Sequence, residues 1–326
     1  MKTENRKCPI CEKSNEIPVD AMNFTCPHCS TNLIKINRPL LTEVFTTKDE
    51  IDKEIYRKII INFCSQLNSE GIIFENNKEK QEAFTGCLLE IMQSLSKANS
   101  CRRAYIQIEE KEIKSLYERN KGDNYVGAVV PVDLNTQLDG VLIHLKSALD
   151  SLAKATKPLF GFSLPTWKKV RDKDGKEKSG LAVFTSLKNI SETPDDNLKN
   201  ITKFVADNLE WISFLVNLRD KPVHHGKTQA SNLIYSEHTQ KVTPQLIIYP
   251  TGKELVVSFM EKSIKEITDF IHIFLRLSFN VKAKNGETVV FDDKGDAFWY
   301  VPGLEEFIRS EKEKSKESRG KSQNNS

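Results

Sequence analysis

Apolar residues recur every three or four positions over most of residues 77–157, and this spacing constrains the fold more than any other feature. The first stripe contains Phe84, Leu88, Ile91, Leu95, Ala98, Tyr105, Ile108 and Leu116. A period near 3.6 residues marks one face of an α-helix, so this stripe predicts either two helices that meet at Asn99-Ser100 or one very long helix with only a kink there. A second stripe predicts a helix over residues 135–157. Amphipathic helices of this length bury their apolar faces against one another, which predicts a helical bundle.

Weaker sequence patterns before residue 77 and after residue 157 predict the remaining helices and strands. A capping box, Thr47-Lys48-Asp49-Glu50, predicts the start of a helix that runs to about Asn68. Two further helices are predicted over residues 195–218 and 263–280. Short strands are predicted at 233–235, 246–249 and 255–259, and the strand-turn-strand segment 288–301 is expected to pair with them. The expected class is therefore mainly α, with a small antiparallel β element.

Two Cys-Pro-x-Cys sequences near the N-terminus predict a metal site. They are Cys8-Pro9-Ile10-Cys11 and Cys26-Pro27-His28-Cys29, at the spacing of a four-thiolate Zn²⁺ site. His28 could in principle replace a cysteine, but four thiolates already complete a tetrahedron. Such a closed site is structural rather than catalytic. So short a segment buries too little apolar surface to fold unaided, and zinc is expected to supply its folding energy. This part of the chain resembles a zinc ribbon.

Charge and cysteine usage narrow the class of protein. The net charge of +3 is too small to indicate nucleic-acid binding by itself. Six basic residues and three acidic ones share the loop at 168–178, which favours a solvated hairpin tip over an RNA-contacting loop. Cys64, Cys87 and Cys101 are expected to be small buried side chains. Their odd number, with no apolar targeting segment or membrane span, favours a cytoplasmic protein.

The segment Leu218-Arg219-Asp220-Lys221-Pro222-Val223-His224-His225-Gly226 carries the candidate chemistry. Arginine offers a planar, permanently charged fork that matches phosphate oxygens, and histidine moves protons near neutral pH. Together, Arg219 and His224 can act on one phosphate. The simpler interpretation is a surface helix terminus, where arginine and histidine interact favourably with the C-terminal end of the helix dipole.

This segment is similar to the signature of the HEPN families: an arginine, then four to six residues of which the first is polar, then a histidine. Arg219, Asp220 and His224 fit it, and Ala148-Leu149-Asp150 resembles a run on a neighbouring helix of those families. Lys146 and Asp150 would share a helix face, either supporting the site or forming an exposed ion pair. Pro222 departs from a continuous helix, because proline removes an amide donor.

The resemblance implies a HEPN-type bundle and a metal-independent endoribonuclease of a toxin–antitoxin or antiviral defence system. It also implies a homodimer with facing motifs, and an antitoxin or other regulatory partner. His224 would carry protons, and Arg219 would neutralise charge on the phosphoryl oxygens. Asp220 would either orient one of these two side chains or hold the backbone of the motif. His225 is an alternative proton carrier. A non-catalytic scaffold that binds nucleic acid or a protein is the competing hypothesis.

The domain organisation expected from these patterns has four parts. Residues 1–36 form the zinc ribbon, and residues 37–79 form a linker and a helix. Residues 80–305 form the HEPN-like helical domain with its β insertions. Residues 306–326 are charged and nearly devoid of apolar side chains, so a disordered tail is expected there.

Overall fold

The computed structural model describes the chain over the following residues: 3–8, 13–18, 23–28, 32–35, 49–61, 74, 77–121, 128–129, 132–162, 164, 167, 174, 196–225, 230–236, 238–239, 241–249, 252–282, 288–291 and 297–300. Over residues 219–225 it describes the backbone alone. The chain divides into two compact units. Unit 1 comprises Met1–Val44, Ile61–Asn76 and Ser278–Ser326, and unit 2 comprises Phe45–Ile60 and Asn77–Leu277.

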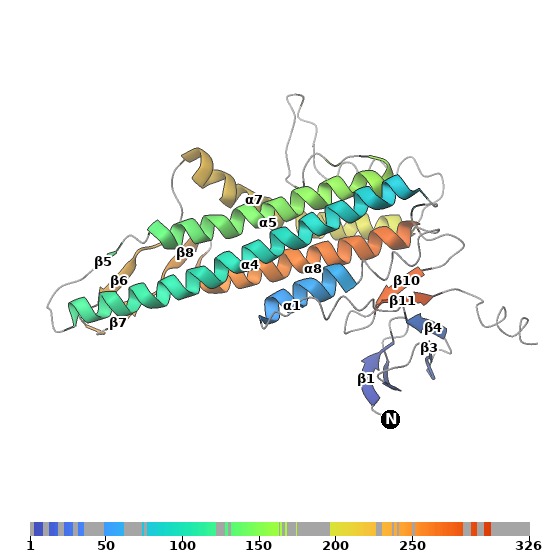
Figure 1. Cartoon of the computed structure of the whole chain (residues 1–326), viewed down its shortest axis with the longest axis horizontal. Helices are drawn as coiled ribbons and strands as arrows, with labels where there is room; N and C mark the ends of the chain where they lie inside the picture. The colour runs from blue at the N-terminus through green and yellow to red at the C-terminus, as the bar shows by residue number, and fades with distance from the viewer. Residues whose placement is uncertain are drawn as a thin grey trace, which may run out of the picture. The chain divides into compact units, whose positions relative to one another are not determined.

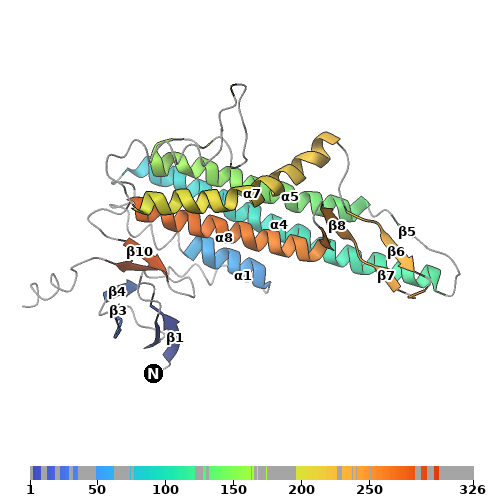
Figure 2. The ribbon, with the colours of Figure 1, turned by 180° about the vertical axis from the view of Figure 1, so that it is seen from behind.

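Unit 2 is built from long helices that lie side by side (Figures 1 and 2). They are α4 (Lys78–Asn120), α5 (Val132–Phe160), α7 (Asp196–His225) and α8 (Val256–Lys282, whose last residues belong to unit 1). The short α1 (Glu50–Tyr56) continues into a π-helical turn, η2 (Arg57–Ile61). The predicted mainly α class is confirmed. Among the described residues, no helix is long and apolar enough to cross a membrane.

The core of unit 2 is made by the predicted stripes. Phe84, Leu88, Ile91, Leu95 and Ala98 of α4 are each at most 3% exposed, and α5, α7 and α8 bury equivalent faces. Each such side chain contributes roughly 1.5–3 kcal/mol through removal from water. Trp167, directly before the predicted loop at 168–178, is also buried in this core. Its Nε1 donates to the Leu149 carbonyl at 2.9 Å, and its ring lies edge-on to Phe270.

The structure decides between the two alternatives for α4 and moves the start of α1. The helix α4 passes through Asn99-Ser100 without interruption, so the single-helix alternative is correct. The N-cap of α1 is Asp49 rather than Thr47, because the Asp49 carboxylate accepts hydrogen bonds from the amides of Ile51 and Asp52. A carboxylate suits this position, since it also interacts favourably with the positive end of the helix dipole. Residues 62–68, the rest of the helix predicted after the capping box, lie outside the described residues.

The β element of unit 2 differs from the one that the sequence indicated. Strands β5 (Ala128–Val129), β6 (Leu233–Ser236) and β7 (Lys241–Thr243) form an antiparallel sheet, while β8 (Leu246–Tyr249) and β9 (Gly252–Leu255) form a hairpin. The predicted strand at 255–259 is wrong, because the chain enters α8 at Val256. Val256, Phe259, Met260 and Ser263 are buried at helical spacing, which overrides the β-branched run.

Unit 1 contains the N-terminal strands and the last hairpin. Strands β1 (Thr3–Lys7) and β2 (Ser14–Pro18) pair with each other. A second sheet has the order β10-β11-β4-β3, from β3 (Asn23–Thr25), β4 (Asn32–Lys35), β10 (Thr288–Phe291) and β11 (Ala297–Tyr300). The hairpin at 288–300 was expected to pair with the strands of unit 2. It pairs with β4 instead and thereby satisfies the backbone groups of an edge strand.

Candidate functional site

The two Cys-Pro-x-Cys sequences occupy equivalent places in two hairpins of unit 1. The last paired residues of β1 and β2 are Lys7 and Ser14, so the first sequence begins directly after the ladder. The second hairpin ends its ladder at Thr25 and Asn32, and Cys26 follows in the same way. The Cys8 amide donates to the Lys13 carbonyl at 2.9 Å and closes the first loop. In both loops, therefore, cysteines hold the first and fourth positions.

Asn15 links the two hairpins. Its side chain is 5% exposed, and its Nδ2 donates to the carbonyl of Lys13 at 2.8 Å. Its Oδ1 lies 3.9 Å from Sγ of Cys26 in the other hairpin, so it ties the first loop to the second cysteine pair. The sequence analysis missed this residue, because a lone asparagine beside a strand carries no pattern.

The described cysteines have the burial that a structural metal site requires. Cys8 is 1% exposed and Cys26 is 0% exposed, whereas His28 is exposed at the tip of its loop. Cys11 and Cys29 lie outside the described residues. Among the residues that the structure describes, no group of three or more cysteine, histidine or acidic side chains could hold a metal. Buried thiols at matched loop positions fit Zn²⁺, which binds thiolate in closed tetrahedral sites.

The arginine–histidine segment forms the end of α7. This helix was predicted to stop at Leu218, but its backbone continues through Pro222 to His225. The C-terminal part of α7 turns away from α8 (Figure 2), as expected near a proline that leaves the Leu218 carbonyl without its amide partner. Positions 219 and 224 are five residues apart, so they lie about 140° apart around the helix axis and about 7.5 Å along it.

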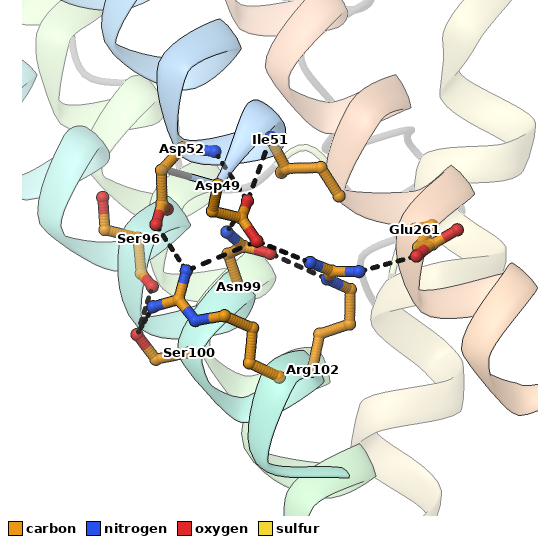
Figure 3. Close-up of polar contacts among 9 residues, drawn as sticks. Asp49, Ile51, Asp52, Ser96, Asn99, Ser100, Arg102 and Glu261 are labelled. Atoms are coloured by element: carbon orange, nitrogen blue, oxygen red, sulfur yellow. Dashed lines mark hydrogen bonds and ion pairs between the residues drawn. The ribbon is translucent and has the colours of Figure 1, made fainter. Parts of the chain in front are cut away.

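A second polar cluster lies at the start of α1, where two arginines of α4 meet carboxylates (Figure 3). Arg102 donates to Asp49 at 2.9 Å and to Glu261 of α8 at 2.6 Å, while its Nε donates to Asn99. Asn99 in turn donates to Asp49 at 2.8 Å. These contacts join α1, α4 and α8 in one network.

Arg103 completes that cluster on its outer side. It pairs with Asp52 at 2.5 Å and donates to the Ser100 hydroxyl at 3.1 Å. Burial raises the pKa of Asp49, but hydrogen bonds from the Asn99 side chain and the Asp52 amide, together with the charges of Arg102 and Arg103, hold it below its usual value. Since both guanidinium groups are engaged by carboxylates, the cluster stabilises the helices rather than offering a phosphate site.

Substitution of Arg102 tests this structural role. Its side chain is 10% exposed, and Arg102→Ala removes the nearer cation of the Asp49 carboxylate, which keeps only Arg103 at 3.7 Å. We expect a loss of about 2–4 kcal/mol in the free energy of unfolding, as for a broken buried ion pair. Arg119, an exposed arginine near the end of the same helix, is the matched control, and Arg119→Ala is expected to change stability by less than about 0.5 kcal/mol. Urea unfolding followed by circular dichroism measures both; equal midpoints would contradict the assignment.

A buried acid connects α4 to the segment between β7 and β8. Glu109 accepts a hydrogen bond from the Gln245 amide at 3.2 Å, and the Tyr105 hydroxyl lies 2.8 Å from Oε1 of Gln245. The Tyr105 hydroxyl also donates to Glu109 at 3.3 Å. Burial raises the pKa of Glu109 above its usual value, more than the hydrogen bonds from the Gln245 amide and from Tyr105 lower it. The ionised form is therefore disfavoured in the folded protein.

The raised pKa of Glu109 predicts a pH dependence of stability. Because its folded pKa exceeds the unfolded one, its contribution is fully present below the unfolded pKa and is lost as pH rises through the folded pKa. Glu109→Gln keeps an acceptor oxygen but cannot ionise. We expect its urea midpoint to exceed that of the wild type at pH 7, with a smaller difference at pH 4. Glu118→Gln, an exposed control on α4, should show no such trend; a trend there, or a constant difference for Glu109→Gln, would contradict the prediction.

Lys146 and Asp150 form an ion pair of 2.6 Å on α5, with side chains 27% and 47% exposed. Their mutual contact and exposure favour an exposed surface ion pair over a role in supporting the candidate site.

The chain was compared with known protein families, curated proteins and solved structures. No protein-family model, curated protein or solved structure matches it.

Proposed function

We propose that this protein is a metal-independent endoribonuclease with a HEPN-type helical domain and an N-terminal zinc ribbon. The observation that carries the proposal is that the whole arginine–histidine segment, Arg219 to His225, lies on one helix of a bundle, at its C-terminal end. Catalytic side chains must be held in a precise geometry, and a helix of the bundle is a rigid element that can hold them. The resemblance to the HEPN signature supplies the reaction.

The chemistry follows from the residue types. RNA carries its own nucleophile, the 2′-hydroxyl, so the protein needs only to move protons and to neutralise charge. His224 takes the proton from that hydroxyl or delivers one to the leaving 5′-oxygen. Arg219 stabilises the added negative charge on the phosphoryl oxygens, and Asp220 orients one of the two. His225 is the second candidate proton carrier. DNA lacks the 2′-hydroxyl and is inert by this route.

The helix geometry supports a site that two copies share. Positions 219 and 224 lie about 140° apart around α7, so one straight helix does not present both on one face. Two α7 ends that face each other across a two-fold axis can place Arg219 of one copy opposite His224 of the other. Closed two-fold dimers are the commonest form of soluble oligomer. The proposed ribonuclease is therefore a homodimer.

Zinc in this proposal is structural. The thiolates of Cys8, Cys11, Cys26 and Cys29 would hold Zn²⁺ and supply the folding energy of the hairpins around them. The matched loops and the buried sulfurs of Cys8 and Cys26 support this part. With four protein ligands there is no open coordination position for a substrate.

A non-catalytic scaffold is the second candidate function. The same 140° separation favours it, because a single helix presents the arginine and the histidine to different surroundings. In that case the segment serves as a charged helix end, and the ribbon docks a protein or a nucleic acid.

Incubation of the purified protein with structured and unstructured RNA in excess chelator tests the proposal. We expect cleavage by the wild type and little by Arg219→Ala. Intact RNA in every sample, with both proteins folded, would leave the scaffold as the function.

A further inference from the structure

Two helix faces of unit 2 form an open groove whose chemistry the ribonuclease proposal does not use. The groove has a volume of about 630 Å³ and lies between α7 and α8, with Glu254 of β9 on its border. From α7 it takes Asp207, Glu210, Trp211, Phe214 and Leu215, which are spaced i, i+3, i+4, i+7 and i+8 on one face. From α8 it takes Phe259, Lys262, Ser263 and Glu266, at the same spacing.

The floor of the groove is apolar and partly aromatic. Leu215 is 2% exposed and Phe259 is 4% exposed, while Phe214 leaves 42% of its surface in water. Trp211 is held in place because its Nε1 donates to the Asn208 side chain at 2.8 Å and its ring lies edge-on to Phe270. Fixed aromatic side chains in a groove offer contact area at a low cost in conformational entropy.

The walls of the groove are acidic. Asp207, Glu210, Glu254 and Glu266 supply four carboxylates against the single ammonium of Lys262, which lies 4.0 Å from Glu266 and is exposed. Burial raises the pKa of Glu266, and the neighbouring carboxylates Glu254 and Asp269 raise it further against the opposing effect of Lys262. A cation brought into the groove would relieve this repulsion.

We propose that the groove between α7 and α8 is a docking site for a basic amphipathic helix of a partner protein. Helices of this kind place their apolar face in a hydrophobic groove and contact it through side chains at positions i, i+3, i+4 and i+7. Their lysines and arginines then meet the four carboxylates of the walls, and complementary charge selects the partner.

Charge argues against two other occupants. A nucleic acid would bring phosphates against the carboxylates, and a second copy would bring the same carboxylates against each other. Like-charge contacts of this kind cost several kcal/mol. The inference is independent of RNA cleavage, although Leu215 lies only one turn before Arg219, so a bound partner would be next to the arginine–histidine segment.

Peptide binding measured by fluorescence anisotropy tests the proposal. The probe is a synthetic helix of about 18 residues, five turns long, with leucine and phenylalanine on one face and lysine and arginine on the other. A scrambled peptide of the same composition lacks the apolar face. Three groove variants are compared with the wild type: Glu210→Lys, Glu210→Lys/Glu266→Lys, and Phe214→Ala. The matched control, Glu79→Lys/Glu118→Lys, reverses the charge of two exposed acids on α4 outside the groove.

We expect the amphipathic probe to bind the wild type more tightly than the scrambled peptide. The double groove variant should weaken binding by about tenfold or more, and the Phe214 variant should weaken it severalfold. The α4 control should retain nearly all of the affinity. No binding by the wild type, equal binding of the scrambled peptide, or an equal loss in the α4 control would overturn the proposal. Spermine binding with the same dependence on the variants would also overturn it, as would loss of a wild-type dimer in the groove variants.

Discussion

Replacement of either catalytic candidate is expected to reduce RNA cleavage by about 10²-fold or more. In the proposed mechanism, Arg219→Ala removes the cation that stabilises the phosphoryl oxygens, and His224→Ala removes the proton carrier. Both positions belong to the end of α7, beyond the last core position of that helix described as buried, Leu218. The loss should therefore appear in the rate, with little change in the unfolding transition. Initial rates with a labelled RNA, measured beside circular dichroism melts, give both quantities.

His225→Ala is the matched control for these variants. It removes a histidine from the adjacent position of the same helix, which lies about 100° further around the axis. We expect a milder loss than for His224→Ala. If the two histidine variants lose activity equally, or if His225→Ala loses more, the assignment of His224 as the proton carrier is wrong.

Loss of one zinc ligand is the second large effect. If the proposed zinc site supplies the folding energy of β1 to β4, Cys26→Ser should lower the bound zinc from about one per chain towards none and expose these strands to hydrogen exchange. The pairing of Phe298 and Trp299 in β11 with Lys35 and Ile34 in β4 extends the expected loss to the last hairpin. Amides of α4 and α5 should keep their protection, because these helices belong to unit 2.

Cys87→Ser provides the control for that experiment. Cys87 is a half-buried thiol on α4 whose pKa is raised by burial, so this variant makes the same chemical change away from the hairpins. It should retain zinc and leave the exchange of β10 and β11 unchanged. The view that the metal stabilises unit 1 alone would be contradicted if unit 2 unfolded together with unit 1 in Cys26→Ser. Unchanged zinc content in this variant would also contradict it.

The helices were predictable because each carries its own signal. The stripe from Phe84 to Leu116 has the helical period, and it encodes α4 without reference to any other part of the chain. The strands depended on partners far away in the sequence. Nothing in residues 288–300 indicates that β11 pairs with β4, because a two-stranded segment with an open edge pairs with whichever edge the fold brings near.

Local patterns failed where tertiary contacts decided the outcome. Val256 and Val257 favour a strand by residue type, yet they begin α8, whose buried face continues to Phe279. Thr47 fitted a capping box, but Asp49 caps α1, because only a carboxylate there also pairs with Arg102. Asn99 was a candidate break between two helices, but it lies inside α4 and is a member of that network.

Of the two candidate sites, the cysteine site was predictable from local sequence and the groove was not. Spacing alone identified Cys8 and Cys26, which the structure places at equivalent loop positions, because thiolate ligands require a short fixed separation in sequence. The groove between α7 and α8 was not predictable. Its acidic residues come from three elements, and each of them taken alone resembles an ordinary solvated position.

The chemical form of the RNA ends tests the central claim most directly. RNA is incubated with the wild type and with the Arg219→Ala/His224→Ala double variant in excess chelator, and the 3′ ends of the fragments are identified by mass spectrometry. The account predicts 2′,3′-cyclic phosphate ends from the wild type, since the 2′-hydroxyl is the nucleophile, and at most a trace from the double variant. Fragments ending in a 3′-hydroxyl, or equal cleavage by the two proteins, would contradict it.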